Sequence, residues 1–142
     1  MNSISVRVAD WQKDNADLRR IREKVFIAEQ AVPPELEWDN EDAQAVHFLA
    51  YEGDYAIGTA RLLPDGQIGR VSVLKDWRGL NVGDALLAAV IAEAERRGLL
   101  EQRLSAQVQA TPFYERHGFR VLSEEYLDAG IPHVDMLRQQ SS

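Results

Sequence analysis

The run from Val71 to Leu87 constrains the fold of this chain more than any other segment. An alternating stretch leads into a loop with glycines at Gly79 and Gly83, and the loop opens directly into an apolar helix predicted to end at Arg97. The first N–H groups of a helix have no partner within it and carry partial positive charge, so this junction can hold a pyrophosphate. A tight connection that needs glycine only for packing would leave the same pattern.

The periodicity of the whole chain predicts elements in the order β-α-loop-β-β-β-α-β-α-β-β. The expected strands are 4–8, 46–51, 55–63, 67–74, 103–108, 119–123 and 133–137, and the expected helices are 15–30, which Asp14 can cap, 82–97 and 112–117. Residues 35–42 are acidic and aperiodic, which predicts a loop that can include one helical turn. The fold class is therefore α/β (α+β): a mixed, mostly antiparallel sheet of six to seven strands flanked by helices. A length of 142 residues fits one domain.

Composition excludes several classes of protein. The formal net charge is −7, whereas a nucleic-acid-binding surface needs a basic track. No apolar run approaches the length of a membrane span, and the first residues lack the pattern of a signal peptide, so we expect a cytoplasmic protein without membrane or nucleic-acid partners. There is no cysteine and the three histidines stand far apart, so neither a disulfide nor a metal site is expected.

Two motifs carry a resemblance to a known family. Arg78, Asn81 and Gly83 follow the spacing of a fingerprint in which Arg or Gln is followed after two residues by Gly and, after one more, by Gly or Ala. The later segment 113–119 reads Phe-Tyr-Glu-Arg-His-Gly-Phe. Together they resemble the GNAT superfamily of N-acyltransferases. Asn81 stands where the middle glycine is usual, and because asparagine tolerates left-handed backbone, the turn is expected to survive.

The resemblance covers essentially the whole chain and extends to one branch of the family. Residues 25–30, 37–39 and 130–133, together with His47, look like the ElaA-like branch of predicted acyltransferases. The resemblance implies one GNAT-like domain over residues 1–142. It also implies transfer of an acetyl group from acetyl-CoA (coenzyme A) to the primary amine of a small, cationic acceptor, by direct attack on the thioester and without a metal. Late strands of this fold often pair between subunits, which leaves a homodimer open.

The same resemblance assigns residues to the coenzyme. The strand before the fingerprint pairs its backbone with the pantetheine amides, which gives this role to Val71 and Val73, and the Val73 N–H could polarise the thioester carbonyl. The pyrophosphate would lie on Arg78, Gly79, Leu80, Asn81, Val82, Gly83 and Asp84. Gln107 could hydrogen-bond the coenzyme arm. Tyr114 matches a tyrosine beside the sulfur, whose hydroxyl can protonate or hydrogen-bond the leaving thiolate, with aromatic packing of the short helix as the alternative.

The acidic segment 35–42 is the candidate acceptor site. An amine like that of lysine, with a reference pKa of about 10.4, must lose a proton before it attacks, and a carboxylate can assist. Glu37 is the candidate base because it matches the branch motif, and Asp39 and Asp42 are expected to face the acceptor. His47 and His133 are further candidates for acceptor contacts or for the base. A solvated acidic loop and structural histidines are the alternatives.

Two classes of function therefore stay open. The first is the N-acyltransferase, and the second is a non-catalytic acyl-CoA sensor or partner-binding module of the same fold, which the altered fingerprint at Asn81 keeps open. The identity of the acceptor, the preferred acyl chain and the nature of the base (carboxylate, histidine or water) also stay open.

Overall fold

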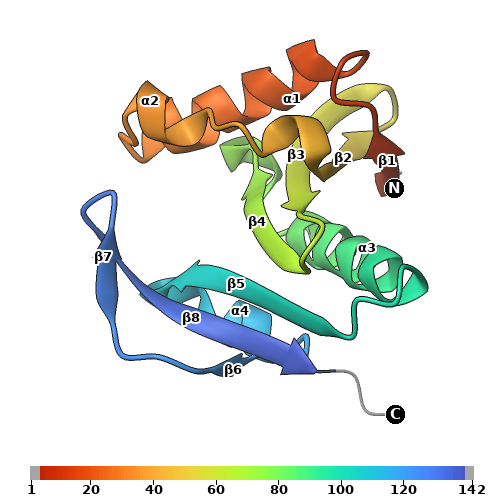
Figure 1. The fold of residues 1–142 in the computed structure, drawn as a ribbon. Helices are drawn as coiled ribbons and strands as arrows, with labels where there is room; N and C mark the ends of the chain where they lie inside the picture. Colours follow the sequence, from red (N-terminus) through yellow and green to blue (C-terminus); the bar gives the residue numbers. More distant parts are fainter. Residues whose placement is uncertain (1–3, 140–142) are drawn as a thin grey trace.

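An eight-stranded sheet organises the chain (Figure 1). The computed structural model describes residues 4–139, in which the strands follow the order β1-β2-β3-β4-β5-β8-β6, with β7 paired to β8. The strands are β1 (Ile4–Ala9), β2 (Val46–Glu52), β3 (Tyr55–Leu62), β4 (Gln67–Val73), β5 (Glu101–Gln107), β6 (Arg120–Val121), β7 (Tyr126–Asp128) and β8 (Ile131–Gln139). Every pairing is antiparallel except that of β4 with β5, so the predicted mixed, mostly antiparallel sheet is confirmed.

Helices cover both faces of the N-terminal part of the sheet. The helices are α1 (Asn15–Arg22), the π-helical segment η1 (Glu23–Glu29), α2 (Pro34–Glu37), α3 (Val82–Arg96) and α4 (Thr111–Glu115), with 3-10 turns η2 (Asp42–Gln44), η3 (Lys75–Trp77) and η4 (Val108–Ala110). Figure 1 shows α1 and α2 on one side of strands β1–β4 and α3 on the other. The sheet is therefore the middle layer of the molecule.

The side chains of β2 show how the two layers are held. Phe48 and Ala50 join the core cluster that contains α3, whereas Leu49 joins the cluster that contains α1, and all three are almost completely buried. Successive strand residues point to opposite faces, so a strand covered on both sides must be apolar at nearly every position. Burial of each such side chain contributes about 1.5–3 kcal/mol. The sheet is thereby fixed between two helical layers.

Strands β4 and β5 share only a short seam. Their parallel pairing consists of Gln67 with Arg103 and Ile68 with Leu104, and no further pair joins the two strands within residues 4–139. Beyond this seam the strands diverge (Figure 1). The sheet therefore carries a wedge-shaped opening along the second half of β4.

Three local predictions differ from the structure, whereas the helical turn allowed in the acidic segment is present as the short helix α2. The sheet has eight strands rather than six to seven, because Tyr126–Asp128 forms a hairpin with Ile131–His133 in a stretch predicted to be irregular. The first helix is α-helical only to Arg22 and continues as the π-helical segment. The side chain of Asp14 makes no cap hydrogen bond, because Arg7 and the N–H of Asp10 occupy its carboxylate.

Candidate active site

A cleft of about 360 Å³ lies in the opening between β4 and β5. It is lined by β3, β4, β5, α4, the turn before β8 and the segment from η1 to α2. Among the predicted site residues, Glu37, Val71, Gln107, Tyr114 and His133 line it. Residues that are far apart in the sequence thus meet at one opening.

The free edge of β4 presents backbone groups to this opening. The N–H of Leu74 donates to the carbonyl of Ile57 on β3 at 2.8 Å. Since successive N–H groups of a strand point to opposite edges, those of Val73 and Val71 face the β5 side, where the strands have separated. These are the two residues that the sequence assigns to an extended amide-bearing ligand.

The turn before α3 has the backbone that the fingerprint requires. Gly79 has a φ of +80° and Asn81 a φ of +64°, so the predicted left-handed conformation at Asn81 is confirmed. Asn81 immediately precedes α3, whose first residues are Val82, Gly83 and Asp84. The free N–H groups of this first turn therefore adjoin the cleft-side end of β4.

Gly83 also packs closely against α4. A Cβ atom built on Gly83 would lie 3.4 Å from the ring of Phe113. That distance is tighter than most Cβ contacts, so α4 and the beginning of α3 approach closely because position 83 lacks a side chain. The packing interpretation of this glycine therefore applies alongside the ligand-binding one.

The side chain of Arg78 is engaged within the protein. Its Nη1 and Nη2 atoms donate to the two carboxylate oxygens of Glu29 at 2.6 and 2.7 Å, and its Nε donates to the carbonyl of Val73 at 2.9 Å. The hydrogen bonds from Arg78 lower the pKa of Glu29. Both side chains are about 40 % exposed, so the pair is open to competition from a ligand anion.

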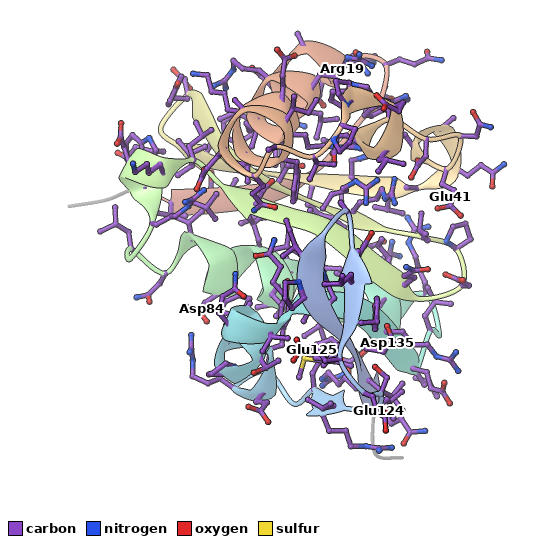
Figure 2. The ribbon with its side chains drawn as sticks, turned by 90° about the vertical axis from the view of Figure 1, so that its left-hand side faces the viewer. Arg19, Glu41, Asp84, Glu124, Glu125 and Asp135 are labelled. Atoms are coloured by element: carbon purple, nitrogen blue, oxygen red, sulfur yellow. The ribbon has the colours of Figure 1, made fainter. Side chains whose placement is uncertain are left out.

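Asp84 lies at the beginning of α3, next to α4 (Figure 2). Its Oδ1 accepts from Nε2 of His117 at 2.8 Å and from Arg116 at 3.3 Å. The hydrogen bond from His117 and then that from Arg116 lower the pKa of Asp84. The carboxylate therefore joins α4 to α3, while its backbone N–H stays in the first turn of the helix.

Tyr114 lies on α4 and borders the cleft. Its ring packs edge-on against Phe113 and Phe119, with centroids 5.0 and 6.0 Å away. Burial raises the pKa of Tyr114 to about 12. The phenol is therefore protonated at neutral pH and retains an O–H that can donate a hydrogen bond.

The acidic segment does not form a free acidic patch. Glu37 and Asp42 are 2 % and 3 % exposed. Glu37 accepts from Nε of Arg22 at 2.7 Å, and Asp42 accepts from Arg22 at 2.8 Å and from Arg61 at 3.0 Å. Asp39 accepts from Nη1 of Arg61 at 2.9 Å.

A third guanidinium, that of Arg70, completes this network. Its Nε lies 3.2 Å from Oε2 of Glu37, and its Nη2 lies 3.3 Å from Asp39. Three carboxylates thus face three arginines, and the local charge cancels. The carboxylates of the predicted acceptor site are therefore engaged in ion pairs rather than free in solvent.

Glu37 borders the cleft, and its carboxylate is already engaged by guanidinium groups. Burial raises the pKa of Glu37, while Arg70 and Arg22 act in the opposite direction. Its carboxylate already receives one charged hydrogen bond and lies beside a second guanidinium. A carboxylate in this position neutralises buried cations, which is a structural role.

The two candidate histidines lie in different surroundings. His47 is 1 % exposed, stacks on Trp11 with centroids 4.6 Å apart, and contacts the carbonyl of Asp42 through Nε2 at 2.8 Å. It is absent from the lining of the cleft, and burial lowers its pKa. His133 does line the cleft, and its Nδ1 contacts the carbonyl of Ile131 at 2.6 Å.

The sequence reasoning missed the second half of the site. The cleft also contains Arg70 and Gln30, and Gln30 accepts a hydrogen bond from Nε2 of Gln107 at 2.9 Å. From the sequence, Arg61 could bind a carboxylate on the acceptor or form a surface ion pair, and its side chain is only 5 % exposed. The available signal was the placement of Arg61 and Arg70 within strongly apolar strands, where an arginine must find partners.

Two further features bear on the class of protein. Among residues 4–139, no group of three or more His, Cys, Asp or Glu side chains is placed to hold a metal ion. None of the helices described above combines the length and the apolar character needed to cross a membrane.

Comparison with known proteins identifies the family. The model of the acetyltransferase (GNAT) domain matches residues 9–139. The uncharacterized N-acetyltransferase YjcF of Bacillus subtilis is 40 % identical over 135 residues, which cover 92 % of this chain and 96 % of that protein. An acyl-CoA N-acyltransferase from Pseudomonas aeruginosa superimposes with a TM-score of 0.84 at 30 % identity, covering 96 % of this chain and 99 % of the other.

Escherichia coli ElaA superimposes with a TM-score of 0.86 at 27 % identity, covering 95 % of this chain and 99 % of ElaA. The likeness extends over nearly the whole length of both proteins, and it agrees with the predicted resemblance to the ElaA-like branch. The chain belongs to the GNAT family of acetyltransferases.

Proposed function

We propose that this protein transfers an acetyl group from acetyl-CoA to the primary amine of a small acceptor by direct attack on the thioester. The observation that carries the proposal is the continuity of three features. Val71 on the free edge of β4 lines the cleft beside Tyr114, Val73 follows it on the same edge, and the turn at Gly79 and Asn81 leads from the end of β4 into α3. An extended thiol ester with a pyrophosphate at one end matches this series of donors.

The coenzyme would contact the turn and the strand edge. The N–H groups at the beginning of α3 would receive the pyrophosphate, which they can bind without a net positive charge on the protein. The guanidinium of Arg78 would leave the carboxylate of Glu29 and pair with the phosphates instead. The N–H groups of Val71 and Val73 would pair with the amide-bearing arm, and Gln107 lines the same cleft.

The reaction needs one bond to form and one to break. The amine nitrogen attacks the thioester carbonyl carbon, and the Val73 N–H stabilises the negative charge that develops on its oxygen. The carbon–sulfur bond then breaks, the sulfur leaves as a thiolate, and the nitrogen loses a proton to give the amide. Tyr114 serves as a hydrogen-bond donor to the thiolate. With a pKa of about 12 against about 8.5 for an ordinary thiol, full proton transfer from the phenol would be uphill by roughly 5 kcal/mol.

For the base, the geometry favours His133 over Glu37. The contact of Nδ1 of His133 with a carbonyl oxygen requires a proton on Nδ1, so in the neutral ring Nε2 carries the free lone pair. His133 also borders the cleft, whereas the carboxylate of Glu37 is occupied by guanidinium groups. His133→Gln should therefore lower kcat with its best acceptor.

An acceptor screen with acetyl-CoA tests the proposal as a whole. A panel of primary amines is supplied with acetyl-CoA, and the free thiol released is measured against a reaction without amine. We expect release that depends on the amine and that Gly83→Val suppresses. Binding of acetyl-CoA in a calorimetric titration, without turnover of any amine, would identify a non-catalytic sensor instead. The conformation of Asn81 gives no reason to prefer that alternative, because the turn has the required backbone.

A further inference from the structure

The arginine that lines the cleft from β4 has an unusual backbone. Arg61 pairs with Gly69 and Thr59 pairs with Ser72, so Arg70 and Val71 together oppose the single residue Ala60. This is a β-bulge, and Arg70 within it has a φ of +53°. A left-handed conformation at a residue other than glycine costs about 1–3 kcal/mol and persists where the surroundings enforce it, frequently at functional sites.

The bonds that hold Arg70 leave part of its guanidinium free. Its Nη2 donates to the carbonyl of Glu37 at 3.0 Å and lies 3.3 Å from both the carbonyl of Leu36 and Oδ2 of Asp39. Its Nε lies 3.2 Å from Glu37 but at an angle that makes no hydrogen bond. Among residues 4–139, no hydrogen bond or ion pair involves its Nη1, and the side chain is 23 % exposed.

Arg61 contributes a second incompletely bonded guanidinium to the same cleft. All three of its hydrogen bonds, to Asp39 and Asp42, use Nη1. Its Nε is buried without a partner among the described residues. A buried donor without an acceptor costs about 1–3 kcal/mol, so two such arginines at one cleft require an explanation.

The rest of the cleft indicates what the missing acceptor is. Its wall is mixed, with polar groups exposing more surface than the apolar side chains, which include Phe26, Val32, Leu63, Ile68, Leu104 and Ile131. Its charged lining groups are Arg61, Arg70, Glu37 and Asp128, so the charges balance. A cleft with balanced charges suits an acceptor that carries one carboxylate together with its amine. It suits a doubly charged phosphate group less well. A carboxylate matches the flat fork of a guanidinium.

We propose that the acceptor amine carries a carboxylate group, as in an amino acid, and that Arg70, assisted by Arg61, binds this carboxylate while the amine faces the reacting end of the cleft. The inference rests on the proposed acetyl transfer. Arg70 is a specificity residue here, since it contacts the acceptor away from the bond that forms. The bulge at β4 keeps its guanidinium in the cleft.

The test compares matched acceptors. Each amino acid of a panel is assayed beside its carboxamide and its decarboxylated amine, with saturating acetyl-CoA and thiol release as the readout, and O-phosphoethanolamine represents phosphate-bearing amines. We expect kcat/KM for the acids to exceed that for their carboxamides about tenfold or more, because a charged hydrogen bond is lost in the amide.

Two variants then assign the preference to Arg70. Arg70→Gly suits the left-handed backbone, and it should raise KM for the acids about 10- to 100-fold while leaving the carboxamides unchanged. Arg70→Lys keeps a cation beside Glu37 and the fold with it, and should show an intermediate loss. Arg103→Gln removes an exposed arginine from β5 and serves as the control, with parental rates expected.

The outcomes separate this inference from the proposed function. Equal rates for acids and carboxamides, a preference for the phosphate-bearing or purely cationic amines, or an equal effect of Arg70→Gly on acids and carboxamides would overturn the carboxylate assignment and leave acetyl transfer standing. Absence of thiol release with every amine, although acetyl-CoA binds, would overturn both.

Discussion

Replacement of Glu37 by glutamine distinguishes a structural carboxylate from a catalytic one. Glu37 is 2 % exposed, its Oε2 accepts from Arg22 at 2.7 Å, and the Nε of Arg70 lies 3.2 Å away. Glutamine keeps the size and one oxygen of the side chain but removes the negative charge. The variant therefore leaves the buried Arg22 and the half-buried Arg70 with one compensating carboxylate fewer.

The structure sets the magnitude of the effect. Removal of one partner from a buried ion pair costs about 3–5 kcal/mol, because the remaining charge stays buried. Arg22 retains Asp42 and Arg70 retains Asp39, so we expect the lower end, about 3 kcal/mol. In a domain of this size that loss lowers Tm by roughly 12 °C.

Glu35→Gln is the matched control. Glu35 lies two residues earlier on α2 and is exposed, so the same change of charge there should alter the free energy of unfolding by less than about 0.5 kcal/mol. Urea unfolding and thermal melts of both variants measure the difference, and thiol release with the best acceptor measures activity. A Glu37→Gln protein that unfolds like the parent but has lost turnover would refute the structural role and restore Glu37 as the base.

Three further predictions concern the coenzyme. Tyr114→Phe should lower kcat about 10- to 100-fold, because it removes one hydrogen bond to the charged thiolate. The melting temperature should stay unchanged, because the ring packing is kept. Full turnover of this variant would make Tyr114 a packing residue. Asn81→Gly should bind acetyl-CoA at least as tightly in a calorimetric titration, since glycine adopts a φ of +64° without strain, and a large loss would reveal a contact of the asparagine side chain. Glu29→Gln should tighten acetyl-CoA binding about two- to fivefold, because it frees Arg78 from a half-exposed ion pair. Unchanged affinity would mean that Arg78 does not contact the phosphates.

The local sequence pattern was sufficient to predict the strands, the helix and the turn that form the proposed coenzyme-binding half of the site. The alternation of β2 to β4, the glycine at the end of α3 and the residue types of the turn depend on neighbours within a few positions. Asn81 illustrates this, because its tolerance of left-handed backbone follows from its own side chain. The predicted fold class followed from the same signals.

The acceptor half of the site depends on contacts that a local pattern does not contain. Arg22 meets Glu37 and Asp42 across 15 and 20 residues, and Arg70 meets Glu37 across 33. Read locally, residues 35–42 are a run of acidic side chains, and only the tertiary structure supplies the arginines that neutralise them. His47 was assigned to the acceptor for the same reason, although the fold places it against Trp11.

The short seam between β4 and β5 has a consequence for folding cooperativity. Two residue pairs join the halves of the sheet, so the amide hydrogens along the free edge of β4 should exchange with solvent faster than those paired with β3. A pantetheine arm lying in this opening would act as a surrogate strand and complete the sheet. Ligand at a hundred times its Kd would then add about 2.7 kcal/mol to global stability and slow exchange at Val71 and Val73 in particular. The proposed co-substrate would thus also be a temporary part of the architecture, and the protein would be least rigid between turnovers.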